Sequence, residues 1–387
     1  MQRECYTRLA MAEIHTLRVA PGDRNLERQF IELPHRVYRG VRQWVPYFRR
    51  GIRNVLRRKH PFFDHSKGEF LIARRGGDPR AVLGVFENRR ANEQRGKREA
   101  NFYYFDAFDD QEAIDALFEE AFAWARSRGL TEMVGPQLFG GASGNGILID
   151  GFEHRAAMTM MRYNFPYYAE HLRRLGFEKH LDFYSAELKP DQFRLPDKVA
   201  RVADKVRERG RLTVRTFSTK RELRDIARNV AELYNETLAE HEQNYVLTRR
   251  ELEEMIDEVV SATEPDLVKT LAYQDSIVGY LLAFPDISAA IQRGGGRLAP
   301  WNMLDLLREM RRTQSLIING AGIRKEYRRM GGTALLYSEL ERTAQGRAWR
   351  DVDLTQVAET TELMLRDLET LGGRIYKTHR VYRRSVD

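Results

Sequence analysis

The two halves of this chain repeat one order of apolar runs, turns and helices, and this repetition constrains the fold more than any other feature. In the first half, residues 69–87 form two short apolar runs around a turn at 76–79, which is typical of a β-hairpin. Residues 267–284 repeat the pattern in the second half around a polar turn at 274–276. We therefore expect the same hairpin twice.

The segments that follow each hairpin also correspond. A strand-like run at 102–105 precedes a helix predicted over 110–128, and the run at 315–319 likewise precedes a segment with helical spacing. Each half then ends with an amphipathic helix, a glycine and a last strand, predicted at 177–188 and at 374–383. Repetition at this length predicts a duplicated α/β unit.

Chain length agrees with two domains. At 387 residues the chain exceeds one ordinary core and fits two domains of about 150–200 residues. We expect a helix at the join, because Pro196 and Asp197 favour a helix start and Gly210 a helix end. The predicted order is a disordered leader, a first domain, a connecting helix and a second domain, at residues 1–10, 11–195, 196–210 and 211–387.

Composition narrows the class of protein. The chain is 42% hydrophobic and 31% charged, as in a folded protein, and no apolar run approaches the roughly 18 residues that span a bilayer. The N-terminus lacks the layout of a secretory signal. Cys5 is the only cysteine, so the chain forms no internal disulfide, and its nine histidines are scattered, so no metal is implied. These features favour a cytoplasmic location.

Positive charge is concentrated in one segment. The net charge is +8, and residues 35–60 hold nine Arg or Lys and no acid, interleaved with Tyr38, Trp44, Tyr47 and Phe48. This mixture favours an anionic partner, either a nucleic acid or a membrane surface. The alternative is a solvated amphipathic segment whose aromatic side chains enter the core.

The segment KEYRRMGGTALL at 325–336 joins an apolar run to a helical pattern and has features of a phosphate site. Such a site needs backbone N–H groups at a helix N-terminus and small residues that let oxygens approach. Two glycines and a threonine supply small residues, and two arginines add charge. The corresponding turn of the first half, at 107–112, carries three carboxylates that would repel a pyrophosphate. Only the second half is equipped for the anion.

The stretch from Gly322 to Leu336 resembles motif A of the GNAT superfamily of acyl-CoA N-acyltransferases, with the core Arg/Gln-x-x-Gly-x-Gly/Ala. Arg328 and Gly331 match its first two positions, and Thr333 replaces the last small residue. Further segments across about residues 30–383 resemble a bacterial two-domain GNAT-like family whose members mostly lack an assigned substrate. They are Trp44-Val-Pro46, Pro61-Phe-Phe63, Val134-Gly-Pro136 through Gly151-Phe152, Tyr163-Asn-Phe-Pro-Tyr-Tyr168, Pro285-Asp286, Gly296-Arg-Leu-Ala-Pro300 and Arg380-Val-Tyr382.

The resemblance implies a fold and a donor. It implies an α/β fold of two tandem GNAT-like domains with mixed sheets, the first degenerate and the second binding acetyl-CoA or another acyl-CoA. The residues that would bind this donor are Gly322, Ile323, Arg328, Arg329, Met330, Gly331, Gly332, Thr333 and Ala334.

Catalysis would need a general base, because an ammonium group with a pKa of about 10.4 must lose a proton before it attacks a thioester. Glu359 matches an acidic position of the family's Glu-x-Asn pattern, with Thr361 in place of Asn; an acid near a helix start is the alternative. The helix that follows lacks the tyrosine usual in the superfamily. Tyr376 and Tyr382 are candidates to replace it, on one face of the last strand by alternation, with core packing as the alternative.

Acceptor contacts are expected near three residues. Tyr234, Glu236 and His241 lie at positions where GNAT folds usually contact the acceptor. The insertion at 286–313 is expected to form one wall of the acceptor cleft. The Gly-rich segment at 140–146 resembles an inter-domain loop of the family, and a nucleotide loop is disfavoured because no helical pattern follows it.

The resulting hypothesis is an acyl-CoA-dependent N-acyltransferase, most simply an N-acetyltransferase, that acts on an amine. The basic segment 35–60 would favour an anionic acceptor. Two alternatives stay open. One is a tRNA-dependent aminoacyl or peptidyl transferase of tandem-GNAT type, which would account for a pI near 9.4 and keeps nucleic acid as a partner. The other is a non-catalytic CoA-binding module. The sequence does not fix the amine, the acyl length or the oligomeric state.

Overall fold

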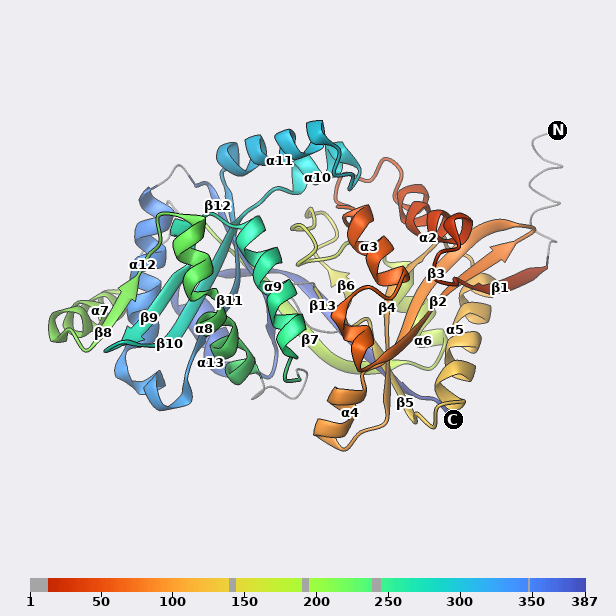
Figure 1. Cartoon of the computed structure of the whole chain (residues 1–387), viewed down its shortest axis with the longest axis horizontal. Coiled ribbons are helices and arrows are strands. Elements are labelled where there is room, and N and C mark those ends of the chain that lie inside the picture. The colour runs from red at the N-terminus through yellow and green to blue at the C-terminus, as the bar shows by residue number, and fades with distance from the viewer. Residues whose placement is uncertain (1–12, 139–143, 190–194, 239–244, 347–348) are drawn as a thin grey trace.

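A single mixed sheet runs through the molecule (Figure 1). The computed structural model describes residues 13–138, 144–189, 195–238, 245–346 and 349–387. Its strands pair in the order β1-β2-β3-β4-β5-β13-β7-β12-β11-β10-β9-β8, and β6 pairs with β13. The predicted α/β fold with a mixed sheet is confirmed.

The elements follow one another in the same order in the two halves. The first half contains β1 (Ile14–Arg18), α2 (Arg24–Val37), α3 (Arg49–Leu56), η1 (Pro61–Asp64), β2 (Lys67–Arg75), β3 (Asp78–Glu87), α4 (Arg89–Arg95), β4 (Glu99–Ala107), α5 (Gln111–Arg126), β5 (Glu132–Gly135), β6 (Ile147–Asp150), α6 (Tyr167–Arg174) and β7 (Glu178–Leu188). The second contains α7 (Asp197–Arg209), β8 (Leu212–Arg215), α8 (Lys220–Leu238), α9 (Arg249–Ala262), η2 (Pro265–Leu267), β9 (Lys269–Tyr273), β10 (Ser276–Pro285), α10 (Ser288–Gly294), α11 (Pro300–Arg312), β11 (Ser315–Ile323), η3 (Lys325–Met330), α12 (Gly332–Gly346), β12 (Asp351–Ala358), α13 (Glu362–Thr370) and β13 (Arg374–Ser385).

The internal repeat predicted from the sequence is visible in this order. Both hairpins form, as β2–β3 and β9–β10, and each is followed by a parallel pair, β4–β5 and β11–β12. Helix α7 covers the segment expected to connect the halves, and α10 and α11 form the expected insertion between β10 and β11.

The halves exchange their last strands. β13, from the end of the chain, lies between β5 and β7, where Tyr382 pairs with Gly135. β7, from the first half, lies between β13 and β12, where Val352 pairs with Leu188. The sheet is therefore continuous across the predicted boundary at residue 195.

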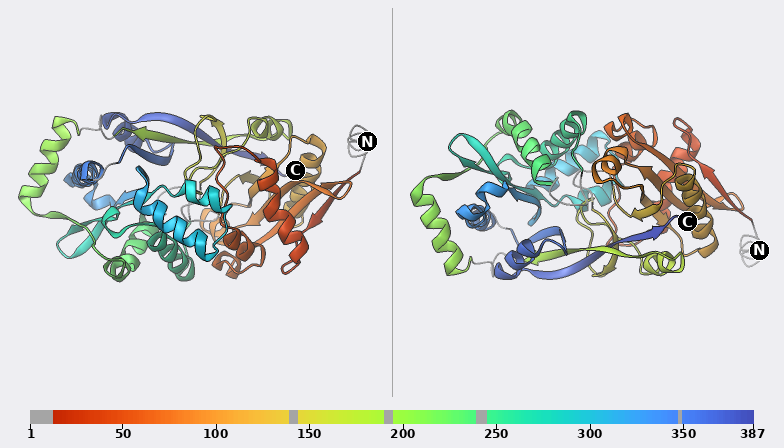
Figure 2. Two further views of the ribbon diagram at one scale, coloured as in Figure 1. Left: turned by 90° about the horizontal axis from the view of Figure 1, so that it is seen from above. Right: turned by 90° about the horizontal axis from the view of Figure 1, so that it is seen from below.

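Helices cover both faces of the second half of the sheet, as the views from above and below show (Figure 2). Along β11, Leu316 and Ile318 join a core that includes residues of α12 and α13, whereas Ile317 joins a core with residues of α8. This alternation is expected of a strand between two helical layers. Of the helices in the described ranges, none has the length and apolar character needed to cross a membrane.

The aromatic side chains of the basic segment enter the core. Tyr38 is only 2% exposed, and Trp44, Tyr47 and Phe48 pack against the same buried cluster. Tyr38 also stacks on Trp44, with ring centroids 5.1 Å apart. These rings contribute to the packing of the fold, as the alternative interpretation predicted.

Candidate functional site

The parallel strands β11 and β12 diverge within the second half. They pair only as far as Ile318 and Leu354, although the strands continue to Ile323 and Ala358. The divergence coincides with a register shift of β11 against β10 and with Gly320, whose φ is 108°. Beyond this point the two strand edges do not pair with each other, so they present backbone groups that an extended ligand is able to bond.

The first half contains the corresponding divergence, but its own side chains bond the strand end. Tyr104 has a φ of 51° at a register shift of β4 against β3. The hydroxyl of Tyr167 donates to the carbonyl of Ala107 at 2.7 Å. The hydroxyl of Tyr168 accepts from the N–H of Ala107 at 2.7 Å and donates to its carbonyl at 3.0 Å. The end of β4 is therefore already bonded within the fold.

Helix α12 begins at Gly332, directly after the turn predicted to hold a phosphate. The first N–H groups of a helix lack intrahelical acceptors and lie at the positive end of its dipole. Thr333 and Ala334 are half-buried, and Arg328 and Arg329 are exposed. An anion in solvent therefore has access to this helix start.

The two glycines of the turn have a packing role that the sequence did not indicate. Gly331 has a φ of 81°, and a Cβ on it would lie 2.6 Å from Cγ2 of Val206 on α7. A Cβ on Gly332 would lie 2.5 Å from Cδ2 of Leu271 on β9. Both glycines therefore allow neighbouring elements to approach, and their role in making room for phosphate oxygens stays a prediction.

The remaining predicted donor residues are also packed. A Cβ on Gly322 would lie 2.9 Å from the ring of Tyr280. Ile323 is 7% exposed and its carbonyl accepts from Nε of Arg328 at 2.9 Å. Met330 packs against the core of the second half. These residues would therefore contact a donor mainly through their backbone atoms.

The corresponding helix start in the first half is occupied by a carboxylate of the chain. Asp110 accepts from the N–H of Ala113 at 3.3 Å and forms ion pairs with Arg75 at 2.7 Å and Arg80 at 3.0 Å. Glu112 pairs with the same Arg75. This arrangement agrees with the prediction that only the second half is equipped for a phosphate.

A carboxylate with a raised pKa lies one residue before the strands diverge. Asp353 projects from the face of β12 opposite Val352 and Leu354, and its Oδ1 accepts a hydrogen bond from the Tyr376 hydroxyl at 2.9 Å. Burial raises the pKa of Asp353 to about 6, although the Tyr376 hydrogen bond and the charge of Lys377 act in the opposite direction. Such a carboxylate is ionised at neutral pH and is able to accept a proton.

Asp353 and Tyr376 belong to a central polar cluster with Lys377, Arg155 and Asp286. Lys377 is 1% exposed, its Nζ donates to the carbonyl of Arg155, and burial lowers its pKa to about 8. Arg155 forms an ion pair of 2.5 Å with Asp286. The cluster therefore joins strands β12 and β13 to the first half and to the end of β10. Among the described residues, no three His, Cys, Asp or Glu side chains gather as a metal site requires.

Glu359 and Tyr382, the other predicted catalytic residues, have structural contacts. The carboxylate of Glu359 accepts from Nζ of Lys179 at 2.7 Å and from the N–H of Asp182 at 3.0 Å. Tyr382 is 3% exposed, and burial raises its pKa. β13 shifts register against β7 between residues 375 and 377 and again between 381 and 382. The first shift interrupts the alternation at Tyr376, and the placement of Tyr376 and Tyr382 on one face stays a prediction.

The predicted acceptor residues lie near the end of β11. Glu236 on α8 forms hydrogen bonds of 2.8 and 3.1 Å with Arg324, the first residue after β11. The ring of Tyr234 lies 5.9 Å from that of Tyr280. His241 lies outside the described residues.

The Gly-rich segment predicted as an inter-domain loop contacts the second half at its described end. Oε1 of Gln356 accepts from the N–H of Asn145 at 2.7 Å, and Nε2 of Gln356 donates to the carbonyl of Asn145 at 2.8 Å. Gln356 has a φ of 52° and follows the last residues that pair with β11. Residues 139–143 of this segment lie outside the described ranges.

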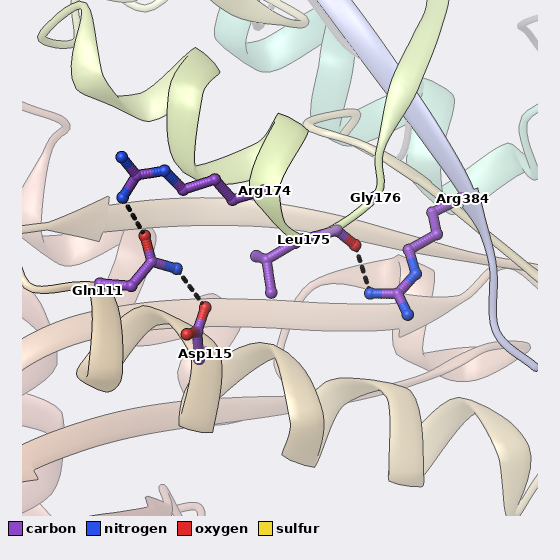
Figure 3. Close-up of a pocket in the computed structure, with 6 residues that line it drawn as sticks. All are labelled: Gln111, Asp115, Arg174, Leu175, Gly176 and Arg384. Atoms are coloured by element: carbon purple, nitrogen blue, oxygen red, sulfur yellow. Dashed lines mark hydrogen bonds between the residues drawn. The ribbon is translucent and has the colours of Figure 1, made fainter.

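A surface pocket of about 510 Å³ lies between α5 and the corner that joins α6 to β7 (Figure 3). Gln111 accepts from Arg174 at 3.0 Å and donates to Asp115 at 2.5 Å, and Arg384 donates to the carbonyl of Leu175. The polar side chains that line this pocket form hydrogen bonds with one another and with the backbone. We therefore do not assign the pocket to the donor.

Sequence reasoning missed Asp353, Lys377 and Arg155. The available signal was a charged residue inside a run of strand type, as in Val352-Asp-Leu354. What brings these three residues together is the exchange of strands between the halves, and a linear pattern does not report it.

Comparisons with known proteins agree with this geometry. No family model matches the chain. It is 25% identical over 371 residues to Protein YghO of Escherichia coli (strain K12), with 94% of each chain covered. It is 23% identical over 370 residues to a protein named bacterial ceramide synthase of Caulobacter vibrioides (strain NA1000 / CB15N), covering 93% of this chain and 94% of that one.

Among solved structures, a tandem GNAT protein from the clavulanic acid biosynthesis pathway matches with a TM-score of 0.57. The match covers 97% of this chain and 99% of that one at 12% identity. The chain therefore has the tandem GNAT fold, as the sequence resemblance implies.

Proposed function

We propose that the second half transfers an acyl group from an acyl-CoA thioester to an amine. The observation that carries this proposal is the divergence of β11 and β12 directly before the accessible start of α12, in a GNAT fold. The part of β11 beyond Ile318, which does not pair with β12, suits an extended donor, and the helix start suits its phosphates. The name of one relative, bacterial ceramide synthase, adds support, because a ceramide is an amide of an amine and an acyl chain.

In this reaction Asp353 is the general base. It takes a proton from the ammonium group of the acceptor, whose nitrogen then attacks the thioester carbonyl and forms the C–N bond. As the C–S bond breaks, the second proton passes from the nitrogen through water to the CoA thiolate, which leaves as the free thiol, and Asp353 returns its proton to solvent. Tyr376 holds the Asp353 carboxylate through its 2.9 Å hydrogen bond, and the ammonium of Lys377 favours the ionised form. Glu359, the base predicted from the resemblance, is the alternative.

The donor site is tested with Thr333→Glu, which gives the second residue of α12 the identity of Glu112, the second residue of α5. A carboxylate in the first turn favours the helix, so the fold is retained, but it repels a pyrophosphate. Calorimetry with acetyl-CoA and longer acyl-CoAs is expected to show affinity reduced by about tenfold or more, since about 1.4 kcal/mol of repulsion suffices. Gln111→Glu, which adds the same charge at the start of α5, is the matched control.

The affinities of the intact protein and the two variants for acyl-CoA distinguish three outcomes. Loss of binding in Thr333→Glu alone supports the donor site at α12. Loss in Gln111→Glu alone moves the donor to the first half, near the pocket of Figure 3. Absence of binding by the intact protein overturns the acyl-CoA proposal. Where binding is found, release of free thiol with neutral, acidic and long-chain amines identifies the acceptor class.

A further inference from the structure

Helix α11 exposes an apolar surface that nothing in the described structure covers. Nine large hydrophobic side chains of the described residues are exposed, and five of them lie between residues 298 and 307. They are Leu298, Trp301, Met303, Leu304 and Leu307. Seen from above, α10 and α11 lie on the near side of the molecule without another element over them (Figure 2).

The apolar side chains of α11 face outward because its other side holds the helix in place. Leu306 is 8% exposed and joins the core. Asp305 and Glu309 form ion pairs of 2.9 and 2.5 Å with Arg293 on α10. Trp301 and Leu304, which are 71% and 57% exposed, are three residues apart and point away from Leu306. The exposed stripe is thus fixed by the fold.

Arginines accompany the apolar stripe. Leu304 is followed at four and seven residues by Arg308 and Arg311, which therefore lie on its side of the helix, and Arg312 follows. All three arginines are exposed, and within the described ranges they form no ion pair. Their charges are available to an outside anion.

The basic segment of the first half is fastened to the connection between α10 and α11. The N–H of Arg49 donates to the carbonyl of Gly296 at 2.9 Å, and its Nε donates to that of Gly295 at 2.8 Å. Gln292 on α10 donates to the carbonyl of Trp44 at 2.7 Å. Five cations of this segment are exposed and, within the described part of the chain, form no ion pair: Arg39, Arg42, Arg50, Arg53 and Lys59.

We propose that α11 and this basic segment form a docking surface for an anionic membrane, with Trp301, Leu304 and Leu307 inserted at the lipid interface. A helix that combines exposed Trp and Leu with Arg lies in the plane of such an interface. Juxtaposed Lys and Arg add attraction to anionic headgroups. A nucleic acid would use the arginines but not the leucines, so the apolar stripe favours lipid.

The surface begins beside the central polar cluster. Asp286, which ends the connection from β10, forms the ion pair with Arg155 and is followed directly by α10. Docking through α11 would therefore hold the cluster close to the membrane, within reach of an amphiphilic amine. The docking itself does not depend on the proposed acyl transfer.

The test is co-sedimentation of the intact protein with vesicles of phosphatidylcholine, with and without phosphatidylglycerol, in the absence of any acyl donor. Partition is expected only with the anionic vesicles and is expected to weaken as salt rises from about 0.1 M to about 1 M, which shortens the Debye length from about 10 to about 3 Å. The double variant Leu304→Glu and Leu307→Glu is expected to reduce partition by about tenfold or more. Leu363→Glu on α13, where the leucine is 73% exposed, is the matched control and is expected to bind normally.

A spectroscopic readout places the contact. Trp124 and Trp349 are 5% and 7% exposed and Trp44 is half-buried, whereas Trp301 is 71% exposed, so most of a blue shift of fluorescence on adding anionic vesicles is expected to come from Trp301 and to be lost in Trp301→Phe. Absence of partition by the intact protein overturns the proposal. So does partition that is lost with Arg308→Gln and Arg311→Gln but kept with the leucine double variant, because the vesicles are then bound by charge alone, without insertion of the apolar stripe. A stable dimer that the leucine variants dissociate, without vesicle binding, also overturns it and assigns the stripe to a second copy.

Discussion

At the scale of single residues, Asp353 acquires its chemistry from its surroundings. Its ordinary pKa of 3.8 is raised to about 6 because it is buried on β12, close to Tyr376 and Lys377 of β13. Tyr376 and Lys377 limit the rise by stabilising the charged form. The same neighbours hold the carboxylate in a fixed direction, which a base in acyl transfer requires.

Replacing this carboxylate tests its role. Asp353→Asn is expected to lower kcat by about 10²- to 10⁴-fold while acyl-CoA affinity stays unchanged, because general-base catalysis is lost and donor contacts are kept. The decline of kcat below pH about 6 is expected to disappear in this variant. Steady-state kinetics across pH measures both effects. Glu359→Gln is the control, and a larger loss of kcat there would transfer the role of base to Glu359.

The same substitution has a consequence for stability. Because the folded-state pKa of Asp353 is above its ordinary value, the folded protein binds this proton more tightly than the unfolded chain. The stabilising effect is full below pH about 4 and is lost as pH rises through about 6. Asp353→Asn is therefore expected to raise the free energy of unfolding by about 3 kcal/mol at pH 8 and by little at pH 4. Urea unfolding at both pH values measures this, and equal effects would contradict it.

At the scale of elements, the packing of α7 on α12 determines why Gly331 is a glycine. The turn before α12 requires a positive φ at this position, and α7 approaches so closely that Val206 lies where a Cβ would point. The connecting helix therefore buttresses the helix whose N-terminus we assign to the donor. The proposed binding of the donor at this turn and the packing of α7 on α12 therefore depend on the same backbone conformation.

This packing is tested with two glycines of similar φ. Gly210, with a φ of 65°, has no atom within 4 Å of its Cβ position, whereas Gly331 has Cγ2 of Val206 at 2.6 Å. Gly210→Ala is expected to lower the free energy of unfolding by about 1 kcal/mol, and Gly331→Ala by about 2–4 kcal/mol. Val206→Ala is expected to recover part of the loss only in the Gly331→Ala background. Equal losses for the two glycines in urea unfolding would contradict the contact.

At the scale of the whole molecule, the exchanged strands make the two halves dependent on each other. β5 and β7 of the first half flank β13 of the second, and β7 in turn completes the sheet of the second half. Removing either half would leave open strand edges in the middle of a sheet, which are sites of aggregation. The predicted boundary at residue 195 therefore separates repeats along the chain, whereas in space the strands interleave.

Separated fragments test this dependence. A fragment of residues 1–195 is expected to show no cooperative thermal unfolding by itself and to regain it when mixed or co-expressed with residues 196–387, because β13 then completes the first sheet. Circular dichroism during heating measures this, with the intact chain as reference. Cooperative unfolding of the isolated 1–195 fragment would show that the first half does not need the exchanged strand.

The sequence by itself determined the local structure of this protein. Apolar alternation, turn residues and helical spacing depend on neighbours along the chain, and they predicted the hairpins, the connecting helix, the insertion and the helix start at 332. Motif residues around Gly331 also led to the prediction that the second half carries an anion site, and the first half has Asp110 and Glu112 at the corresponding position.

Only the tertiary structure decided which distant groups meet. The strand exchange brings Asp353, Lys377 and Arg155 together, and burial then sets the pKa values of the first two. Tertiary packing likewise gave Gly331 a role against α7 and left one side of α11 uncovered. These outcomes depend on contacts between segments more than a hundred residues apart and on the exclusion of water, which no local pattern encodes.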